Sequence, residues 1–152
     1  MAFNIIQDTR EQKPLDFNND AVGQVIVTKL DTGDYSIQGL EDILCVERKS
    51  GLMEFYNNCT QPRFWREMER MAGYKYKFLI MEFPLKDIQD FPYSLNVAKS
   101  VWSKLTLSPQ YLLSCISRIQ VDYGINVIFA ENRDLISSMM ISIMKKVYAN
   151  SN

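Results

Sequence analysis

The chain has 152 residues, of which 47% are hydrophobic and 23% are charged, and its formal net charge is −1. These values predict one globular domain and argue against a generally basic nucleic-acid binder, although they do not exclude a local basic groove. The sequence contains no histidine, which excludes Ser-His-Asp and Cys-His catalysis and zinc sites built on histidine. Any bound metal is therefore expected to be a hard cation on oxygen ligands.

Cysteine usage and hydropathy indicate where the protein resides. Three widely spaced cysteines, an odd number without a metal-binding pattern, predict reduced thiols and a cytoplasmic protein. The N-terminus does not resemble a signal peptide, and no apolar run approaches the ~18–20 residues that cross a bilayer. We therefore expect no association with a membrane.

Closely spaced strands are predicted in the first third of the chain. Apolar and β-branched residues predict strands over residues 3–7, 23–30, 35 onward and 43–49. The charged segment "DTREQKPLDFNND" between the first two is a predicted loop. Because the last three of these strands follow one another closely, we expect them to form a meander.

The rest of the chain alternates between helical and strand patterns. Periodicity predicts helices over residues 52–59, 62–73, 108–124 and about 135–147, and strands over residues 76–83 and 126–130. Pro62 and the Ser108-Pro109 pair suit helix starts, whereas residues 84–107 show no clear pattern. The alternation predicts an α/β domain, ordered over about residues 3–147, with a central mixed β-sheet flanked by helices on both faces.

Charged residues stand where predicted strands meet turns. They form three clusters, Asp8-Thr9-Arg10-Glu11, Gly33-Asp34 and Glu47-Arg48-Lys49. Glu47 and Lys49 are two residues apart, so they share one face of a strand, and the strand ends of a meander can converge. Such carboxylates suit Mg²⁺ or Mn²⁺ in phosphodiester hydrolysis, and a lysine can stabilise the transition state. The alternative is a strand end that simply reaches solvent.

The residues that flank these charges are more specific. The segments "DTREQ", "TGDYSI" and "VERKS" resemble, in this order, the nuclease domain of the XPF family of structure-specific endonucleases, in the PD-(D/E)xK superfamily. The likeness continues in "RFWREMERM", "KFLIMEF" and "CISRIQVDYGINVIFAENRD" and covers about residues 5–147. It implies a restriction-endonuclease-like fold and a single nuclease domain over residues 1–152, without the helix-hairpin-helix or helicase domain that members often carry.

The resemblance implies a role for each charged motif residue. The implied assignments are metal binding for Asp34, Glu47 and Asp8, catalysis for Asp34, Glu47, Arg48 and Lys49, DNA contact for Arg10, and support for Glu11. Asp8 would act on the metal directly or through water, and Glu11 would hold a basic neighbour. The implied cofactor is Mg²⁺ or Mn²⁺, and the implied reaction is hydrolysis of DNA at branched, forked or flap structures.

Two helical stripes suggest partners. Arg63, Arg66 and Arg70 lie in a region, residues 63–77, with five basic and two acidic residues. This local excess of three positive charges makes the stripe a candidate DNA-binding face, with an ordinary solvated helix face as the alternative. The last predicted helix carries an apolar stripe formed by Ile136, Met139, Met140, Ile143 and Val147. With the family resemblance, it suggests a homodimer, and a helicase or DNA-binding partner is the other expectation.

One family position differs in this chain. The family commonly has an aspartate four residues after the motif lysine, and Met53 stands there, with Glu54 beside it. Either Glu54 substitutes after a small shift, or that contact is missing. Two functions stay open: a metal-dependent DNA endonuclease and a catalytically silent DNA-binding or dimerisation scaffold of the same fold. A nuclease domain without further modules suits a prokaryote or a phage.

Overall fold

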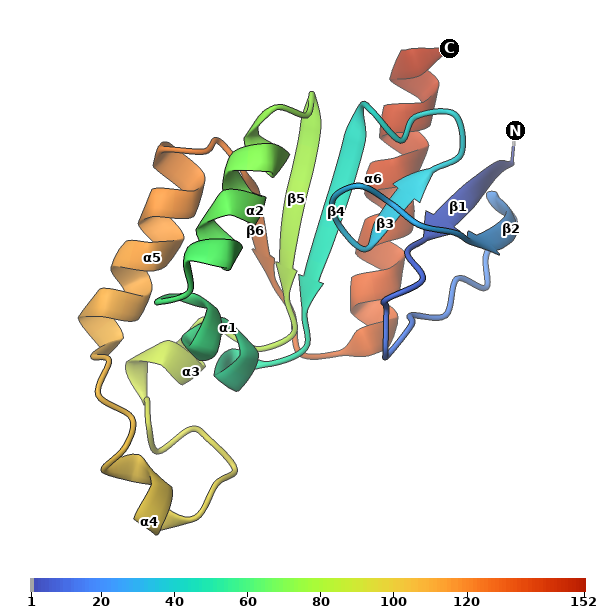
Figure 1. The fold of residues 1–152 in the computed structure, drawn as a ribbon. Helices are drawn as coiled ribbons and strands as arrows, with labels where there is room; N and C mark the ends of the chain where they lie inside the picture. Colours follow the sequence, from blue (N-terminus) through green and yellow to red (C-terminus); the bar gives the residue numbers. More distant parts are fainter. Residues whose placement is uncertain (1) are drawn as a thin grey trace.

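Six strands form a single mixed sheet in the computed structural model, which describes residues 2–152 (Figure 1). The strands are β1 (Phe3–Gln7), β2 (Val22–Val27), β3 (Tyr35–Ile37), β4 (Leu44–Lys49), β5 (Tyr76–Met81) and β6 (Asn126–Phe129). Their order across the sheet is β2-β1-β3-β4-β5-β6. β3 is antiparallel to β1 and β4, whereas β4, β5 and β6 run parallel.

The predicted meander is wrong in the position of β2. This strand pairs in parallel with β1 at the edge of the sheet, and β1 occupies the place beside β3. The middle of β2 is exposed, and the strand ends at Val27 rather than at residue 30. β-branched residues identified this strand, but an exposed strand has no buried face to specify its neighbour. Because Gln7 lies opposite Tyr35, the pairing places Asp8 beside Asp34.

Helices cover both faces of the sheet, as the sequence predicted (Figure 1). The helices are α1 (Leu52–Asn58), α2 (Pro62–Ala72), α3 (Lys86–Gln89), α4 (Lys99–Trp102), α5 (Pro109–Val121) and α6 (Arg133–Ser151). α6 lies alone on one face, and α1, α2, α3 and α5 lie on the other. The predicted start of α5 is confirmed, because the Ser108 side chain accepts a 3.1 Å hydrogen bond from the Tyr111 N–H.

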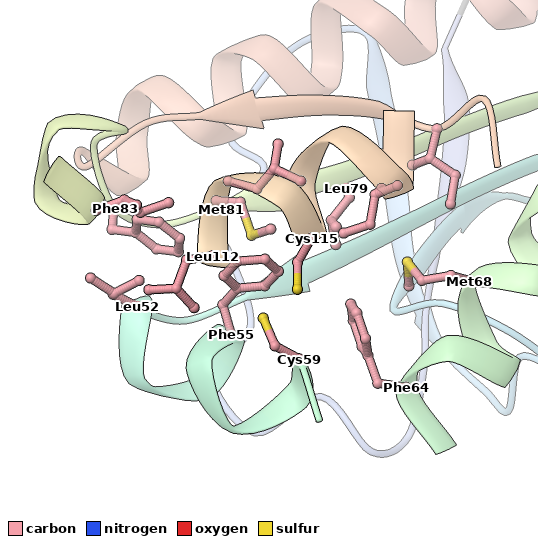
Figure 2. Packing of buried hydrophobic residues seen from close by; sticks show 14 of the residues in the cluster. Leu52, Phe55, Cys59, Phe64, Met68, Leu79, Met81, Phe83, Leu112 and Cys115 are labelled. Atoms are coloured by element: carbon pink, nitrogen blue, oxygen red, sulfur yellow. The ribbon is translucent and has the colours of Figure 1, made fainter. Parts of the chain in front are cut away.

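Alternate residues of β5 supply two hydrophobic cores. Leu79 and Met81 face α1 and α5, where they pack with Phe55 and Leu112 (Figure 2). Ile80 points to the other face and packs into the core beneath α6. The same alternation operates in β4, so this strand is buried along its whole length. Its last three residues are charged, and they are therefore held inside the protein between the two helical layers.

The apolar stripe of α6 packs against the sheet of the same chain. Ile136, Met140 and Val147 are buried in the core between α6 and the sheet. On α6, Leu135 and Met139 leave large apolar side chains at the surface, with 61% and 44% of their area exposed. The stripe therefore covers the sheet, and it does not by itself support pairing between two copies.

Candidate active site

The end of β4 buries three consecutive charges. Glu47, Arg48 and Lys49 retain only 6%, 7% and 8% exposure. Glu47 and Lys49 point toward α2, and the Lys49 Nζ lies 3.2 Å from the Glu47 Oε2. Arg48 points away from them toward acidic residues of other segments. Burying charge is costly unless it is paired, and each of these charges has a partner.

Asp34 is brought to β4 by the turn before β3. Gly33 has a φ of +87°, and an added Cβ would lie 2.6 Å from the Cys45 Sγ, so the turn requires glycine here. The Asp34 N–H donates to the Val46 carbonyl at 2.8 Å, and the Arg48 N–H donates to the Asp34 Oδ2, also at 2.8 Å. The Asp34 carboxyl thus lies beside the backbone of β4, within hydrogen-bonding reach of the Glu47 carboxyl.

Asp8 is buried at the end of β1 and lines the same cleft. Its carboxylate accepts hydrogen bonds from the Leu30 N–H at 2.8 Å and from the Arg10 Nε at 2.7 Å. Burial alone would raise the pKa of Asp8, but these bonds hold it below its ordinary value. Asp8 is therefore an ionised group that fixes Arg10 and the segment after β2 at the edge of the cleft.

Glu67 is a third carboxyl beside Asp34 and Glu47, contributed by α2. Burial is the main cause of the raised pKa of Glu47, and a hydrogen bond with Glu67 and the charge of Asp34 raise it further. Burial also raises the pKa of Asp34. Sequence reasoning did not identify Glu67 as a residue of the site. Its position three residues after the buried Phe64 was the available signal, because residues three apart share a helix face.

Lys49 is the positively charged group beside these carboxyls. Its Nζ also lies 5.2 Å from the centre of the Phe64 ring. Burial alone would lower the pKa of Lys49, but the charges of Glu47, Glu67 and Glu54 raise it above the ordinary value. The side chain is therefore an ammonium at neutral pH, suited to stabilising negative charge rather than to removing a proton.

A cleft of about 400 Å³ joins these groups. Its acidic lining includes Asp8, Asp34, Glu47 and Glu67. Basic side chains lie around it, namely Lys49 within and Arg10, Arg63 and Arg70 at its sides. Arg66, the other arginine of the predicted stripe, is exposed on α2 but is not part of this lining. The cleft thus brings four basic side chains together with four of its acidic ones.

Arg48 belongs to a buried ion-pair network outside the acidic centre. Its guanidinium is paired with both oxygens of Glu11, lies 2.9 Å from the Glu82 Oε1 and donates to the Lys13 carbonyl at 3.0 Å. Arg133, at the start of α6, contacts Glu82 at 3.3 Å and the same Lys13 carbonyl at 2.8 Å. Sequence reasoning missed Glu82 and Arg133, which lie far apart in the chain. The network fixes the loop after β1 to β4, β5 and α6.

Glu54 stands near the position where the family has an aspartate. Its carboxylate accepts a 3.1 Å hydrogen bond from the Ser50 N–H and lines a second hollow together with Glu47 and Lys49. Met53 is half-buried. The Glu54 carboxylate thus lies on the Lys49 side of the site, where its charge helps to raise the pKa of Lys49.

The donor set fits Mg²⁺ or Mn²⁺. Among residues 2–152, no three Asp, Glu, Cys or His side chains form a complete protein shell for a metal ion. Mg²⁺ does not require one, because it usually binds one or two carboxylates and keeps several waters. The neighbouring carboxyls of Asp34 and Glu47 supply this number of ligands at an open cleft. Burial and like charges raise the pKa of Glu47, and a cation would relieve that repulsion.

A protein-family model, the ERCC4 domain, matches residues 7–143. The chain belongs to the ERCC4 domain family. This match spans all three charged clusters and confirms the resemblance to the XPF nuclease domain that their sequences indicated. The family is one of structure-specific DNA nucleases.

Solved structures confirm the fold. XPF from Aeropyrum pernix matches with a TM-score of 0.70 and 23% identity over 95% of this chain and 65% of that chain. XPF from Aeropyrum pernix in complex with DNA matches with a TM-score of 0.68 and 22% identity over 99% of this chain and 66% of that chain. This chain thus spans about two thirds of the length of either. No curated protein matched the sequence, and within residues 2–152 no helix has the length and apolarity to cross a membrane.

Proposed function

We propose that this ERCC4 domain is an endonuclease that uses Mg²⁺ or Mn²⁺ to hydrolyse DNA at branched, forked or flap structures. One observation carries the proposal: the Asp34 and Glu47 carboxyls and the Lys49 ammonium occupy one cleft that is also lined by arginines. DNA in complex with a structurally similar XPF supports the choice of DNA as substrate.

The metal would be held by Asp34 and Glu47. When bound there, it would supply Lewis-acid stabilisation of the phosphate and lower the pKa of water, which accounts for hydrolysis without a histidine. The Arg48 N–H bond fixes one oxygen of Asp34, and the Lys49 Nζ fixes one oxygen of Glu47. Both carboxyls are thereby oriented before any cation arrives.

Lys49 stabilises negative charge at the reacting phosphate. Its raised pKa keeps it protonated at neutral pH, so we assign it an electrostatic role and not that of a general base. Arg10, Arg63 and Arg70 hold the phosphates on either side through charge-assisted hydrogen bonds. We assign Arg48 a positioning role, because its guanidinium is buried between Glu11 and Glu82, whereas the Arg10 side chain, although paired with Asp8, is 64% exposed.

The test is cleavage of a forked DNA by purified protein with Mg²⁺, Mn²⁺, Ca²⁺ or excess chelator. We expect cleavage with Mg²⁺ and Mn²⁺, little with Ca²⁺, whose larger and looser shell positions water poorly, and none in chelator. Lys49→Met should slow cleavage by about a hundredfold or more. Lys75→Met, at an exposed lysine outside the cleft, is the matched control and should cleave like the wild type. Equal cleavage in chelator would contradict the proposal.

A silent scaffold is the second candidate. The observation that favours it is Met53, a half-buried apolar side chain at a position where the family has an acid. A scaffold would bind forked DNA with the same affinity with or without metal and would not cut it with any cation. Binding without cleavage in the same assay would therefore select the scaffold and reject the nuclease.

A further inference from the structure

An arm formed by residues 92–107 projects from the domain between α3 and α5, at the end of the sheet where β4 and β5 end (Figure 1). None of these residues is buried, although they include Val97, Val101 and Leu105. Leu95, Leu105 and Leu107 pack against the edge of the core that α1 and α5 cover, whereas Tyr93 and Lys99 stay exposed. An exposed aromatic ring on a projecting segment is a candidate interaction surface.

Aromatic and basic side chains lie together on the arm. Tyr93 is 73% exposed, and its ring meets that of Trp102 edge-on, with centroids 5.0 Å apart. The Lys99 Nζ lies 5.9 Å from the centre of the Trp102 ring. The Trp102 Nε1 is buried without a hydrogen-bond partner among residues 2–152. The arm therefore presents one large exposed ring, held by a second ring, next to a cation.

The charge of this region is complementary to a polyanion. The arm contains Lys99 and Lys104 but no aspartate or glutamate, so its net charge is +2. The whole chain has a net charge of −1, which leaves −3 on the remainder. A surface that binds a protein need not lack acidic residues. A nucleic acid, in contrast, is attracted by lysines and repelled by carboxylates.

The arm is fixed to the helix that follows the acidic cluster. The Tyr56 ring, on α1, stacks on Phe91 at one end of the arm, with centroids 5.3 Å apart and planes 21° apart. The Tyr56 hydroxyl accepts a 3.3 Å hydrogen bond from the Leu107 N–H at the other end. Because α1 begins three residues after Lys49, both ends of the arm are anchored to the segment that leaves the cleft.

We propose that the arm binds an unpaired DNA strand, with a base stacked on Tyr93 and phosphates paired with Lys99 and Lys104. Aromatic rings beside basic groups are the means by which proteins bind single strands without sequence preference. The position of the strand relative to cleavage rests on the proposed nuclease function, but its binding does not.

The experiment is fluorescence anisotropy in chelator, where no cleavage occurs, with labelled oligothymidine and a duplex of equal length. We expect Tyr93→Ala to weaken binding of the single strand by about tenfold, the effect of losing one stacked base. Lys99→Gln/Lys104→Gln should reduce the salt slope of that binding by about 1.4, and duplex binding should change less. Tyr111→Ala and Lys145→Gln/Lys146→Gln are the controls outside the arm and should bind like the wild type.

The outcomes separate this proposal from the nuclease proposal. Loss of single-strand binding in the arm variants, with or without cleavage activity in the wild type, would support the arm. Unchanged binding in those variants would overturn it, whatever the nuclease assay shows. Unchanged DNA binding together with loss of self-association in Tyr93→Ala, measured by sedimentation, would overturn it as well and would identify the arm as a protein interface.

Discussion

The main-chain N–H of Arg48 donates a 2.8 Å hydrogen bond to the carboxylate of Asp34. This contact joins two motifs that are 14 residues apart and orients an acid of the cleft through the backbone of β4. The Arg48 side chain meanwhile pairs with Glu11 on the other side of the strand. One residue therefore connects the acidic centre with the loop that carries the first motif.

Replacing Arg48 should destabilise the fold. Arg48→Met leaves the buried Glu11 without its cation, and breaking a buried pair from one side costs about 3–5 kcal/mol in unfolding free energy. Urea denaturation would measure the loss. Arg66→Met, at an exposed arginine outside the cleft lining, is the control and should change the unfolding free energy by less than about 0.5 kcal/mol. A loss below about 1 kcal/mol for Arg48→Met would contradict the role assigned to the network.

Stability without metal should fall as the pH rises. The pKa values of Asp34 and Glu47 are raised by burial. A carboxyl with a higher pKa in the folded state holds its proton more tightly there, so stability is lost as pH rises from about 4 through the folded pKa. Thermal midpoints in chelator should therefore be higher at mildly acidic than at mildly alkaline pH. Saturating Mg²⁺ should flatten this slope, and an unchanged slope with Mg²⁺ would count against the metal site.

Glu11 should produce the opposite trend at lower pH. Burial alone would raise the pKa of Glu11, but hydrogen bonds from Arg48 and the Lys13 N–H hold it below its ordinary value. Its stabilising contribution is therefore present above about pH 4.3 and is lost as the pH falls through the folded pKa. Glu11→Gln should show a shallower acid-induced loss of stability by circular dichroism. Glu131→Gln, at an exposed acid, should behave like the wild type, and identical acid curves for both variants would disprove this account.

Glu67→Gln should stabilise the metal-free protein. The substitution removes one of three neighbouring carboxyls and lowers the repulsion on Glu47. We expect a rise in the thermal midpoint in chelator of roughly 3 °C, equivalent to about 1 kcal/mol for a domain of this size. Glu69→Gln, at an exposed acid on the same helix, is the matched control. A fall in the midpoint would show that Glu67 stabilises the cluster instead.

Local patterns in the sequence identified most of the site. Asp8, Asp34, Glu47 and Lys49 stand at strand ends, and the residues around them matched the family motifs. The period of a strand places Glu47 and Lys49 on one face, and the turn at Gly33 brings Asp34 to them, whereas Asp8 joins them through the pairing of β1 with β3. The two-face fold followed in the same way from the alternation of strands and amphipathic helices.

Contacts between distant segments could not be predicted from local sequence patterns. Glu82 and Arg133 are 51 residues apart, and only the parallel pairing of β4 and β5 with the start of α6 brings them to Arg48. The edge position of β2 is likewise a tertiary effect, because its exposed residues specify no partner. The apolar residues of α6 showed that one face is buried, but not that the sheet of the same chain covers it.

The most direct test of the central claim is the single-turnover rate of forked-DNA cleavage by Asp34→Asn in Mg²⁺. Asp42→Asn, at an exposed aspartate before β4, is the matched control. If Asp34 and Glu47 hold the cation, Asp34→Asn should be folded and at least as stable as the wild type in chelator, yet cleave about a thousandfold more slowly. Asp42→Asn should cleave at the wild-type rate. Full activity of Asp34→Asn would contradict the account.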